Sequence, residues 1–266
     1  MSKFPLFILF ILGLLILCVE SSFLLRSTVI KPPAAIPVPV ARPDSATLTH
    51  IRIANQVSAG VSSLACSDVD VTLTQRITFH LKGSIYYEKP KNFRMILSLQ
   101  QPEVDIGSNN TLFWYWSLRM KPPGVYYCDH EHIAETRLRS VFNPMWMMEC
   151  LGFGNISERV GAALDGGQLR VAEQQRGLTR TTIINLQNHL PVEHLLQQQN
   201  QIIATSTVRE WQQIGNCSVP KTLELVWYEE GTKLIIKLNS PVINCKISPT
   251  AWEMPNRAAA INLVGY

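Results

Sequence analysis

The sequence predicts a mainly β protein with a few helices (α+β), built on an antiparallel meander that curves toward a barrel. Three observations predict this class. Apolar and polar residues alternate over short segments along most of the chain, as in strands that bury one face. Short turn sequences separate these segments at regular spacing, which is typical of an up-and-down meander. Helical periodicity is confined to one stretch near the start and to short apolar stretches in the middle.

Length and composition indicate one globular domain and exclude a nucleic-acid-binding protein. The 266 residues are 46% hydrophobic and 17% charged, with a net charge of +4. Lysines and arginines form no run longer than two residues, so the chain lacks the basic footprint that binds phosphate backbones. We therefore expect no nucleic-acid partner.

The N-terminus predicts export. Residues 1–19 carry an uncharged run from Phe4 to Val19 after Lys3, which is shorter than the ~20 apolar residues of a spanning helix and suits a signal sequence. Three interpretations stay open: a lipoprotein signal with lipidation at Cys18, a cleaved secretory signal, or an uncleaved membrane anchor. Leu17 departs from the small residue expected before a lipidated cysteine. All three place the protein in the cell envelope on the periplasmic side, and two of them anchor it to a membrane.

Residues 20–44 are expected to form an extended Pro-rich tether. Five prolines fall within KPPAAIPVPVARP, residues 31–43, and they favour a semi-rigid spacer over a helix. Such a spacer would join a membrane anchor to a folded domain, although a leader of no structural importance fits the composition equally well.

Residues 45–64 predict an amphipathic helix. Apolar residues recur at steps of three and four, and Asp44 or Ser45 can cap the first turn. The apolar positions are Leu48, Ile51, Ala54, Val57, Val61 and Leu64.

Strands follow this helix. Alternation predicts them in Val69–Thr74, Ile77–Tyr87 and Phe93–Leu99. Leu112–Trp116 is apolar on both faces, which in an antiparallel sheet requires cover on both sides. Val125–Tyr127 predicts a further short strand.

The middle of the chain predicts short helices that plug the open side of the sheet. Asn143 can cap a helix, and Pro144 suits its first turn. The helix is expected from Met145 to Leu151 and stops at Gly152, while residues 157–164 predict another helical turn. A soft apolar cluster in this helix suits either an adaptable lid or a permanently buried plug. Its members are Met145, Trp146, Met147 and Met148.

The second half predicts six strands joined by hairpin turns. The strands are expected at residues 168–175, 178–186, 191–199, 202–213, 219–229 and 232–240. The turns are expected at Arg176-Gly177, Asn188–Pro191, Asn200-Gln201, Gly215-Asn216 and Glu230-Gly231. No linker follows residue 44, so residues 45–255 are expected to form one domain, with a C-terminal tail at 256–266.

The cysteines leave at least one free thiol, because five remain once Cys18 is set aside. Cys217 and Cys245 flank the turn at Glu230-Gly231 almost symmetrically, and a hairpin there would bring them near each other. They are the disulfide candidates, and two buried thiols are the alternative.

Four segments together carry a family resemblance. The most specific is GSIYYEKPKNFR (residues 83–94), in which a glycine and an apolar strand lead into a proline turn and Phe-Arg. The others are SNNTLFWYWS (108–117), LPVEHLLQQQNQIIATSTVREW (190–211) and VPKTLELVWYEEGTKLIIKL (219–238). From about residue 45 to 255 this order resembles the LolA/LolB-like family of periplasmic lipoprotein carriers and outer-membrane lipoprotein receptors. The Pro-rich segment and the candidate lipid anchor look more like the receptor, or like a tethered relative.

The resemblance implies an incomplete (half) β-barrel that shelters acyl chains of lipoproteins or lipids, without covalent chemistry, cofactor or metal. Arg94 would then lie where polar and apolar surfaces meet and hydrogen-bond a lipid ester or a lid carbonyl. Ordinary core packing is the alternative for each aromatic residue, and a surface ion pair is the alternative for Arg94. The implied lining of the cavity is Phe79, Leu81, Ile85, Tyr87, Phe93, Met95, Leu97, Trp114, Trp116 and Trp146.

Two other functions remain as alternatives. The same fold would serve an envelope sensor or interaction module that binds an envelope protein partner. A metal-dependent enzyme would use Cys128, His130 and His132, which share one face if a strand continues through them. Because the sequence contains no hydrolase, P-loop or dinucleotide-binding motif, we expect no catalytic residues and a non-enzymatic protein.

Overall fold

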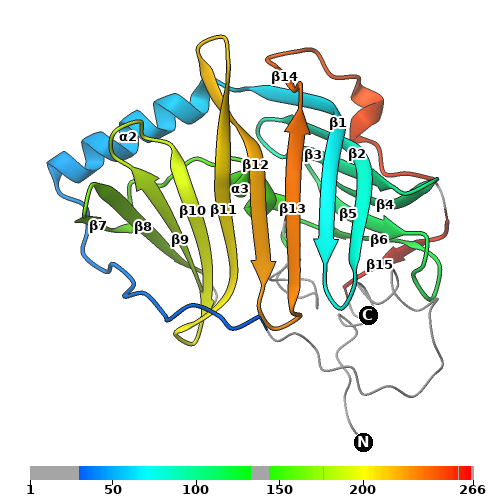
Figure 1. The fold of residues 1–266 in the computed structure, drawn as a ribbon, viewed down its shortest axis with the longest axis horizontal. Helices are drawn as coiled ribbons and strands as arrows, with labels where there is room; N and C mark the ends of the chain where they lie inside the picture. The colour runs from blue at the N-terminus through cyan, green and yellow to red at the C-terminus, as the bar shows by residue number, and fades with distance from the viewer. Residues whose placement is uncertain (1–29, 133–143, 176, 257, 265–266) are drawn as a thin grey trace, which may run out of the picture.

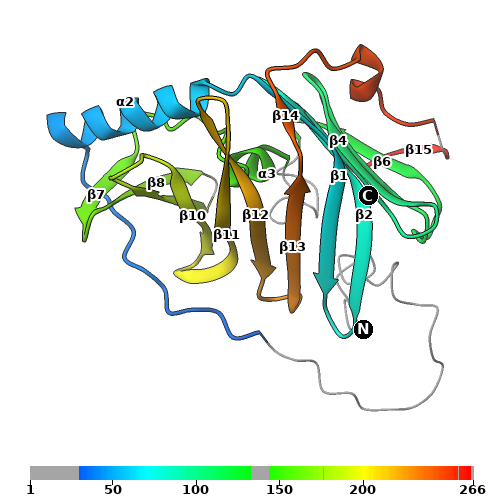
Figure 2. The same cartoon turned by 45° about the horizontal axis from the view of Figure 1, so that its top comes forward.

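The computed structural model describes residues 30–132, 144–175, 177–256 and 258–264. One curved sheet dominates this part of the chain, and helices α2 (Ser45–Ala59) and α3 (Pro144–Cys150) lie against one side of it (Figures 1 and 2). A 3-10 helix, η2 (Pro249–Trp252), belongs to the C-terminal segment. The mainly β class predicted from the sequence is confirmed.

The strands of the first half of the chain are β1 (Ser63–Thr74), β2 (Thr78–Glu88), β3 (Asn92–Ser98), β4 (Pro102–Ser108), β5 (Leu112–Ser117) and β6 (Val125–Asp129). Those of the second half are β7 (Gly161–Asp165), β8 (Gln168–Gln175), β9 (Leu178–Asn185), β10 (Pro191–Gln198), β11 (Gln201–Ile214), β12 (Cys217–Trp227), β13 (Thr232–Asn239), β14 (Val242–Ile243) and β15 (Ala260–Asn262).

The sheet order is β15-β6-β5-β4-β3-β2-β1-β13-β12-β11-β10-β9-β8-β7, and β14 pairs with the start of β1. Because β1 and β13 meet in the middle, the two halves of the chain spread to opposite sides (Figure 1). The last strands of this path, β15 and β7, do not pair with each other, so the sheet stays open over the described residues. The result is a partial barrel.

The two faces of the sheet differ in chemistry. We call the side that carries α2 and α3 the inner face and the other side the outer face. Across β1 and β2, Val71 lies opposite Leu81 and both are buried in the apolar cluster of the inner face. Their neighbours Asp70 and Lys82 lie opposite each other on the outer face and form an ion pair. The period of two therefore separates core from solvent here.

Helix α2 covers one end of the inner face. The Asp44 carboxylate caps its first turn, as the sequence predicts. Ile51 and Ala54 are buried against β7, β8 and β9. The helix is shorter than the predicted 45–64, because the chain from Ser63 onward pairs with β2 in the sheet.

Two elements differ from the sequence-based prediction. Residues 157–164, expected as a helical turn, lead instead into β7, where the Ala162 N–H donates to the Ala41 carbonyl at 2.9 Å. Strand β4 shows no alternation because residues 103–108 are all buried, so period-two reasoning does not find it.

The Pro-rich segment lies against the outer face. Residues 30–43 form neither helix nor strand. Ile36 packs with Ile183 and Leu195, and its carbonyl accepts a hydrogen bond from the Gln197 Nε2 at 3.3 Å. Residues 1–29, which include Cys18, lie outside the described residues. None of the helices in the described part of the chain has the length and apolarity to cross a bilayer.

Close packing on the outer face requires one glycine. The indole of Trp114 on β5 lies over Gly107, its cross-strand partner on β4. A methyl group at residue 107 would overlap the indole ring, so the strand tolerates no side chain there.

We expect Gly107→Ala to destabilise the fold by about 1–3 kcal/mol, since the added methyl group must displace a buried indole. Equilibrium urea unfolding measures this change. In a Trp114→Leu background the same substitution should cost less, because the indole is gone. An equal cost in both backgrounds would contradict the packing argument.

Candidate binding site on the inner face

The inner face of the sheet is a continuous apolar surface. It extends across the junction of β1 and β13, because strands from both halves of the chain contribute buried residues to one cluster. Most of the predicted lining belongs to this cluster, and Phe79 is partly buried against it. The buried lining residues are Leu81, Ile85, Tyr87, Phe93, Met95 and Leu97.

Helix α3 lies on this surface. Trp146, Met147 and Met148 are buried within the same cluster, and the Trp146 ring meets Trp227 edge-on with 6.2 Å between ring centroids. Gly152 ends the helical segment with φ of 82°, a left-handed conformation that favours glycine. A helix without a polar stripe is stable only when covered, and α3 is covered by the sheet. Asn143 and the side chain of Met145 lie outside the described residues.

The segment after α3 returns across β2. The rings of Tyr87 and Phe153 stack with 4.6 Å between centroids. Burial raises the pKa of the Tyr87 hydroxyl far above its ordinary value, so this side chain stays neutral. Tyr87 therefore acts on the inner face as an aromatic surface.

Trp114 and Trp116 lie on the outer face, so the prediction that they line the inner face is wrong. They form a separate cluster with Val125, and Met254 packs against it. Strand β5 is buried on both sides, with Phe113 in the inner cluster. A strand that is apolar on both faces gives no sequence signal for which face points inward.

Arg94 also lies on the outer face. Its guanidinium donates to both carboxylate oxygens of Asp105, at 3.1 and 2.8 Å, and to the Ala251 carbonyl of η2 at 3.1 Å. The Asp105 side chain is fully buried, and 13% of the Arg94 side chain is exposed. The expected bond to a backbone carbonyl exists, but this carbonyl belongs to η2. The prediction that Arg94 borders the apolar lining is wrong, and its contacts fasten the C-terminal segment to the sheet.

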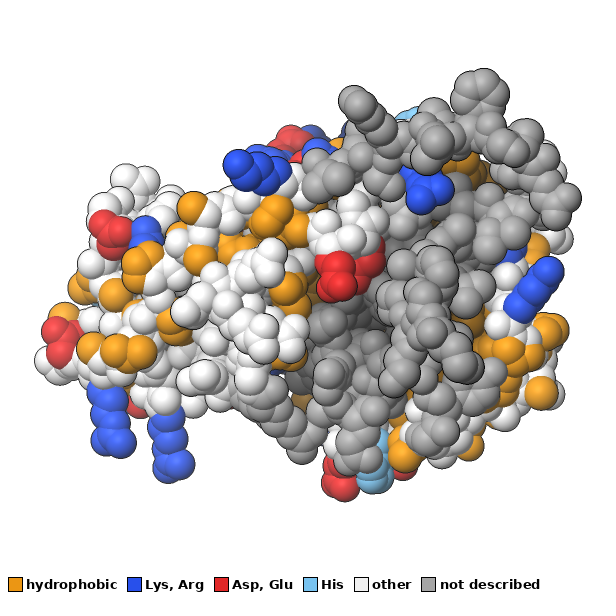
Figure 3. Space-filling model, turned by 90° about the horizontal axis from the view of Figure 1, so that it is seen from below, with side chains coloured by type: hydrophobic (Ala, Val, Ile, Leu, Met, Phe, Trp, Pro, Cys, Tyr) orange, Lys and Arg blue, Asp and Glu red, His pale blue; other side chains and the backbone are white. Residues whose placement is uncertain are grey.

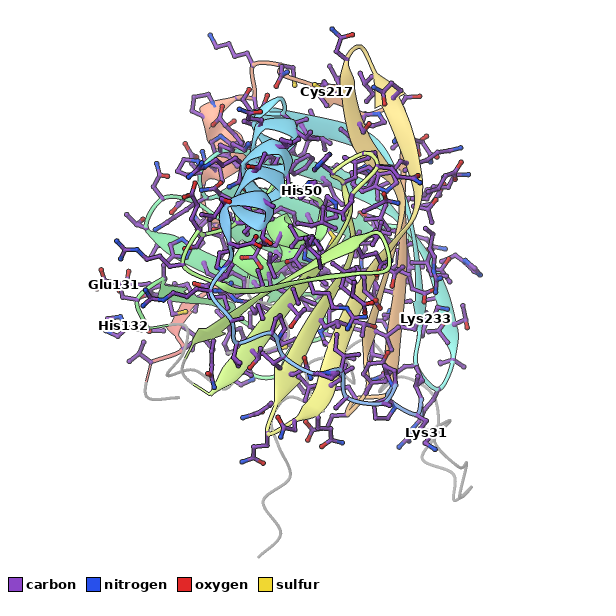
Figure 4. All side chains as sticks on the ribbon, turned by 90° about the vertical axis from the view of Figure 1, so that its left-hand side faces the viewer. Lys31, His50, Glu131, His132, Cys217 and Lys233 are labelled. Atoms are coloured by element: carbon purple, nitrogen blue, oxygen red, sulfur yellow. The ribbon has the colours of Figure 1, made fainter. Side chains whose placement is uncertain are left out.

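The three candidate metal ligands do not converge. Strand β6 ends at Asp129, so His130 and His132 follow in a turn and do not share a strand face with the buried Cys128. The His130 Nε2 bonds the Asn109 carbonyl at 2.7 Å, and His132 lies at the periphery of the molecule (Figure 4). Among the described residues no group of three such side chains is placed to hold a metal ion. The metal-dependent enzyme is therefore not supported.

Cys217 and Cys245 are free thiols in the structure. The β12–β13 ladder ends at the pair Thr222–Lys237, before it reaches either cysteine, and the chain turns away at Ser240. Cys217, at the start of β12, instead donates to the Gly60 carbonyl at 3.4 Å (Figure 4). The hairpin symmetry seen in the sequence does not extend to these residues.

A pocket lined by both apolar and charged side chains adjoins α3 at the β8–β10 end of the inner face. It has a volume of about 60 Å³ and lies between α2, the loop after α3 and the three strands. Glu149 of α3 pairs with Arg180 of β9 at 2.9 Å, and the buried His194 of β10 lines the same pocket. Sequence reasoning missed these residues. The available signals were a single carboxylate in an apolar helix and a histidine in an apolar strand.

The sheet, its apolar inner face and the helix lying on it define a class of open half-barrels. The sequence matches no protein-family model and no curated protein. Solved structures share the fold at low identity. A domain assigned as an outer membrane lipoprotein-sorting protein from Vibrio parahaemolyticus has a TM-score of 0.56 at 9% identity, over 77% of this chain and 97% of its own.

Two further solved structures share this fold. A DUF1329 family protein from Desulfovibrio piger has a TM-score of 0.55 at 9% identity, over 80% of this chain and 98% of its own. A LolA superfamily protein from Nitrosomonas europaea has a TM-score of 0.51 at 8% identity, over 78% and 97%. The fold of this protein is LolA-like, as the resemblance in its sequence predicts.

We expect Asp105→Ala to destabilise the fold by about 3–5 kcal/mol, because it leaves the Arg94 guanidinium largely buried without its charge partner. Glu158→Ala is the matched control, since it breaks an exposed pair with Arg52 and should cost at most about 1 kcal/mol. Urea unfolding of both variants measures the difference. Similar losses of unfolding free energy in the two variants would show that the buried pair stabilises the fold no more than the exposed pair.

His194 should make the fold sensitive to acid. Burial lowers the pKa of its imidazole from 6.5 to about 4, so between these values the unfolded chain binds the proton more readily than the folded chain. The free energy of unfolding should therefore fall as the pH drops from about 6.5 to about 4, by up to about 3 kcal/mol from this group.

The measurement is the unfolding free energy of wild type and His194→Gln across that pH range. The variant should lose less stability on acidification, whereas His80→Gln, at an exposed histidine of β2, should follow the wild type. Parallel profiles for wild type and His194→Gln would contradict the assignment.

Proposed function

We propose that this protein binds acyl chains of lipoproteins or lipids on the inner face of its sheet, and transfers or receives them without covalent chemistry. The observation that carries the proposal is a continuous apolar inner face with a short, methionine-containing helix lying on it. The fold shared with a lipoprotein-sorting protein domain and a LolA superfamily protein supports the same use.

The energetics favour a long apolar surface for this task. Each CH₂ group of an acyl chain moved out of water is worth ~0.8 kcal/mol, so a chain of ~14 methylenes needs a site that offsets about 11 kcal/mol. A short pocket does not have enough apolar surface to offset this free energy. The inner-face cluster has the necessary length, because it runs from β4 across β1 and β13 to β11.

Helix α3 is the part of the site that a chain would replace. The pocket beside it has about 60 Å³, far below the ~300–1,000 Å³ typical of ligand sites, so an acyl chain requires α3 to move. Seven residues are too few for a helix that is stable on its own. Met147 and Met148 can then repack against chains of different shape. The Trp146 Nε1–H has no hydrogen-bond partner among the described residues, so a ligand carbonyl can accept its bond.

The proposal places the protein in the bacterial cell envelope, on the periplasmic side. The export signal predicted in residues 1–19, with Cys18 as a candidate lipidation site, and the Pro-rich segment support this location. Seen from below, charges of both signs are dispersed among apolar and uncharged side chains of the described residues (Figure 3). Such a mixed surface suits a lipid or an acylated protein as a ligand better than it suits a polyanion.

The test is binding of a naturally fluorescent conjugated fatty acid to the full chain. We expect about one bound probe per protein, and energy transfer from Trp146 and Trp227 because both face the cluster in which the chain is proposed to bind. Trp146→Phe should reduce the transfer. Trp252→Phe, in η2 of the C-terminal segment, is the matched control and should leave it unchanged.

Two outcomes would count against the proposal. One is a protein that neither binds the probe nor carries lipid in an organic-solvent extract. The other is equal loss of transfer in the two tryptophan variants. A lipid-free protein that captures a defined envelope protein would favour the interaction-module alternative.

A further inference from the structure

The pocket beside α3 has an excess of negative charge. The guanidinium of Arg180 contributes one positive charge to the pocket. Two carboxylates accept hydrogen bonds from it, Glu149 of α3 at 2.9 Å and Glu173 of β8 at 3.3 Å. Burial raises the pKa of Glu149 even though Arg180 acts in the opposite direction, which means that the guanidinium does not fully compensate the carboxylate. A further cation at this position would be favourable.

His194 lines the same pocket and has an unused ring nitrogen. Its side chain is buried, with 5% of its surface exposed, and its Nδ1 bonds the Thr182 hydroxyl at 3.1 Å. Its Nε2 has no partner among the described residues. Because burial keeps the imidazole neutral, Nε2 can offer a lone pair when Nδ1 carries the proton. A buried unpartnered nitrogen in the wall of a pocket points to a ligand.

Other polar side chains at the pocket are already engaged within the protein. The Ser58 hydroxyl donates to the Gly154 carbonyl at 3.1 Å. The Asn55 side chain, which lies behind the pocket wall, donates to the Ile156 carbonyl and accepts from the Ile156 N–H, both at 2.9 Å. Asn155 lines the exposed rim of the pocket, so the open capacity away from solvent lies with Glu149 and His194. Together they favour a group that donates hydrogen bonds and carries positive charge.

An anionic head group would be rejected here. A carboxylate or phosphate would face Glu149 and Glu173 at close range, and like charges repel strongly in a partly buried site. A primary ammonium group satisfies every requirement, since it is a compact cation with three N–H donors and no acceptor. A volume of about 60 Å³ accommodates such a small group but not an acyl chain.

We propose that this pocket binds the primary ammonium group of an amphiphile whose apolar chain lies on the inner face, so that the ligand is an amine-bearing lipid. The inference rests on the proposed function, because it assigns the head group of the same ligand. Glu149 lies near the end of α3, so in this proposal it keeps its bond to Arg180 while the chain replaces the preceding part of the helix, and head group and chain meet there.

The test compares decylamine, decanol and decanoate by isothermal titration calorimetry with the full chain. We expect decylamine to bind at least about tenfold more tightly than decanol, and decanoate to bind weakest. Glu149→Gln keeps the shape of the side chain and removes its charge, so it should abolish most of the preference for the amine over decanol. Glu173→Gln should reduce the preference in the same direction.

Glu224→Gln is the matched control. Like Glu149, Glu224 is a carboxylate in an ion pair, here with Arg209 and Lys233, but it lies on β12 away from the pocket. Thermal unfolding of each variant checks that it folds, and Glu173→Gln replaces Glu149→Gln if the latter does not. The inference is supported if the preference falls in the pocket variants and persists in the control.

Other outcomes separate the inference from the proposed function. Equal affinity for the three ligands, or tightest binding of decanoate, overturns the ammonium site and leaves the carrier function standing. Absence of binding by all three overturns both. Propylamine distinguishes the source of the amine: binding as tight as that of decylamine would overturn the lipid and indicate a free small amine.

Discussion

An open sheet that buries one face must find cover for that face, and the rest of this structure depends on this constraint. A closed barrel fills its own interior, whereas a half-barrel exposes an apolar surface that water penalises in proportion to its area. Here α2 covers the β7–β9 end and α3 lies on the central region. Both helices are positioned by what the sheet needs to bury.

The outer face follows the same rule with different means. Over β1 and β2 it carries charged and polar side chains and needs no cover. Over β4 and β5 it is apolar, and the segment that contains η2 packs there, held by Arg94. Since the outer cover is fastened by a buried ion pair and the inner one is a short helix, the two covers differ in how easily they move. This difference favours the inner face as the place of the proposed ligand exchange.

Local patterns predicted most of the fold because most strands bury one side only. The alternation in β2 and β3 and the turn at Glu230-Gly231 needed no tertiary information. The sequence failed where burial is two-sided: β4 has no alternation, and β5 gives no indication that Phe113 points inward and Trp114 outward. On the outer face of β5 the cover includes Met254, more than a hundred positions along the chain, which no local window contains.

The candidate site divides in the same way. The apolar lining on β2 and β3 was predictable, because periodicity alone determines which residues share a face. The pocket beside α3 was not, since Glu149, Arg180 and His194 come together only when α3 lies on β9 and β10. A lone charge in an apolar segment is a signal that such a residue has a partner, but it does not say which one.

The meeting of β1 with β13 has a consequence for how the chain reaches this structure. Asp68 pairs with Asn239, so the central ladder joins residues from opposite ends of the domain. Contacts of such high sequence separation form late, because a long loop must close before they contribute. Until β13 emerges from synthesis, the two halves of the sheet are separate meanders with unpaired edges. With the export proposed above, this topology would delay folding while the chain crosses a membrane.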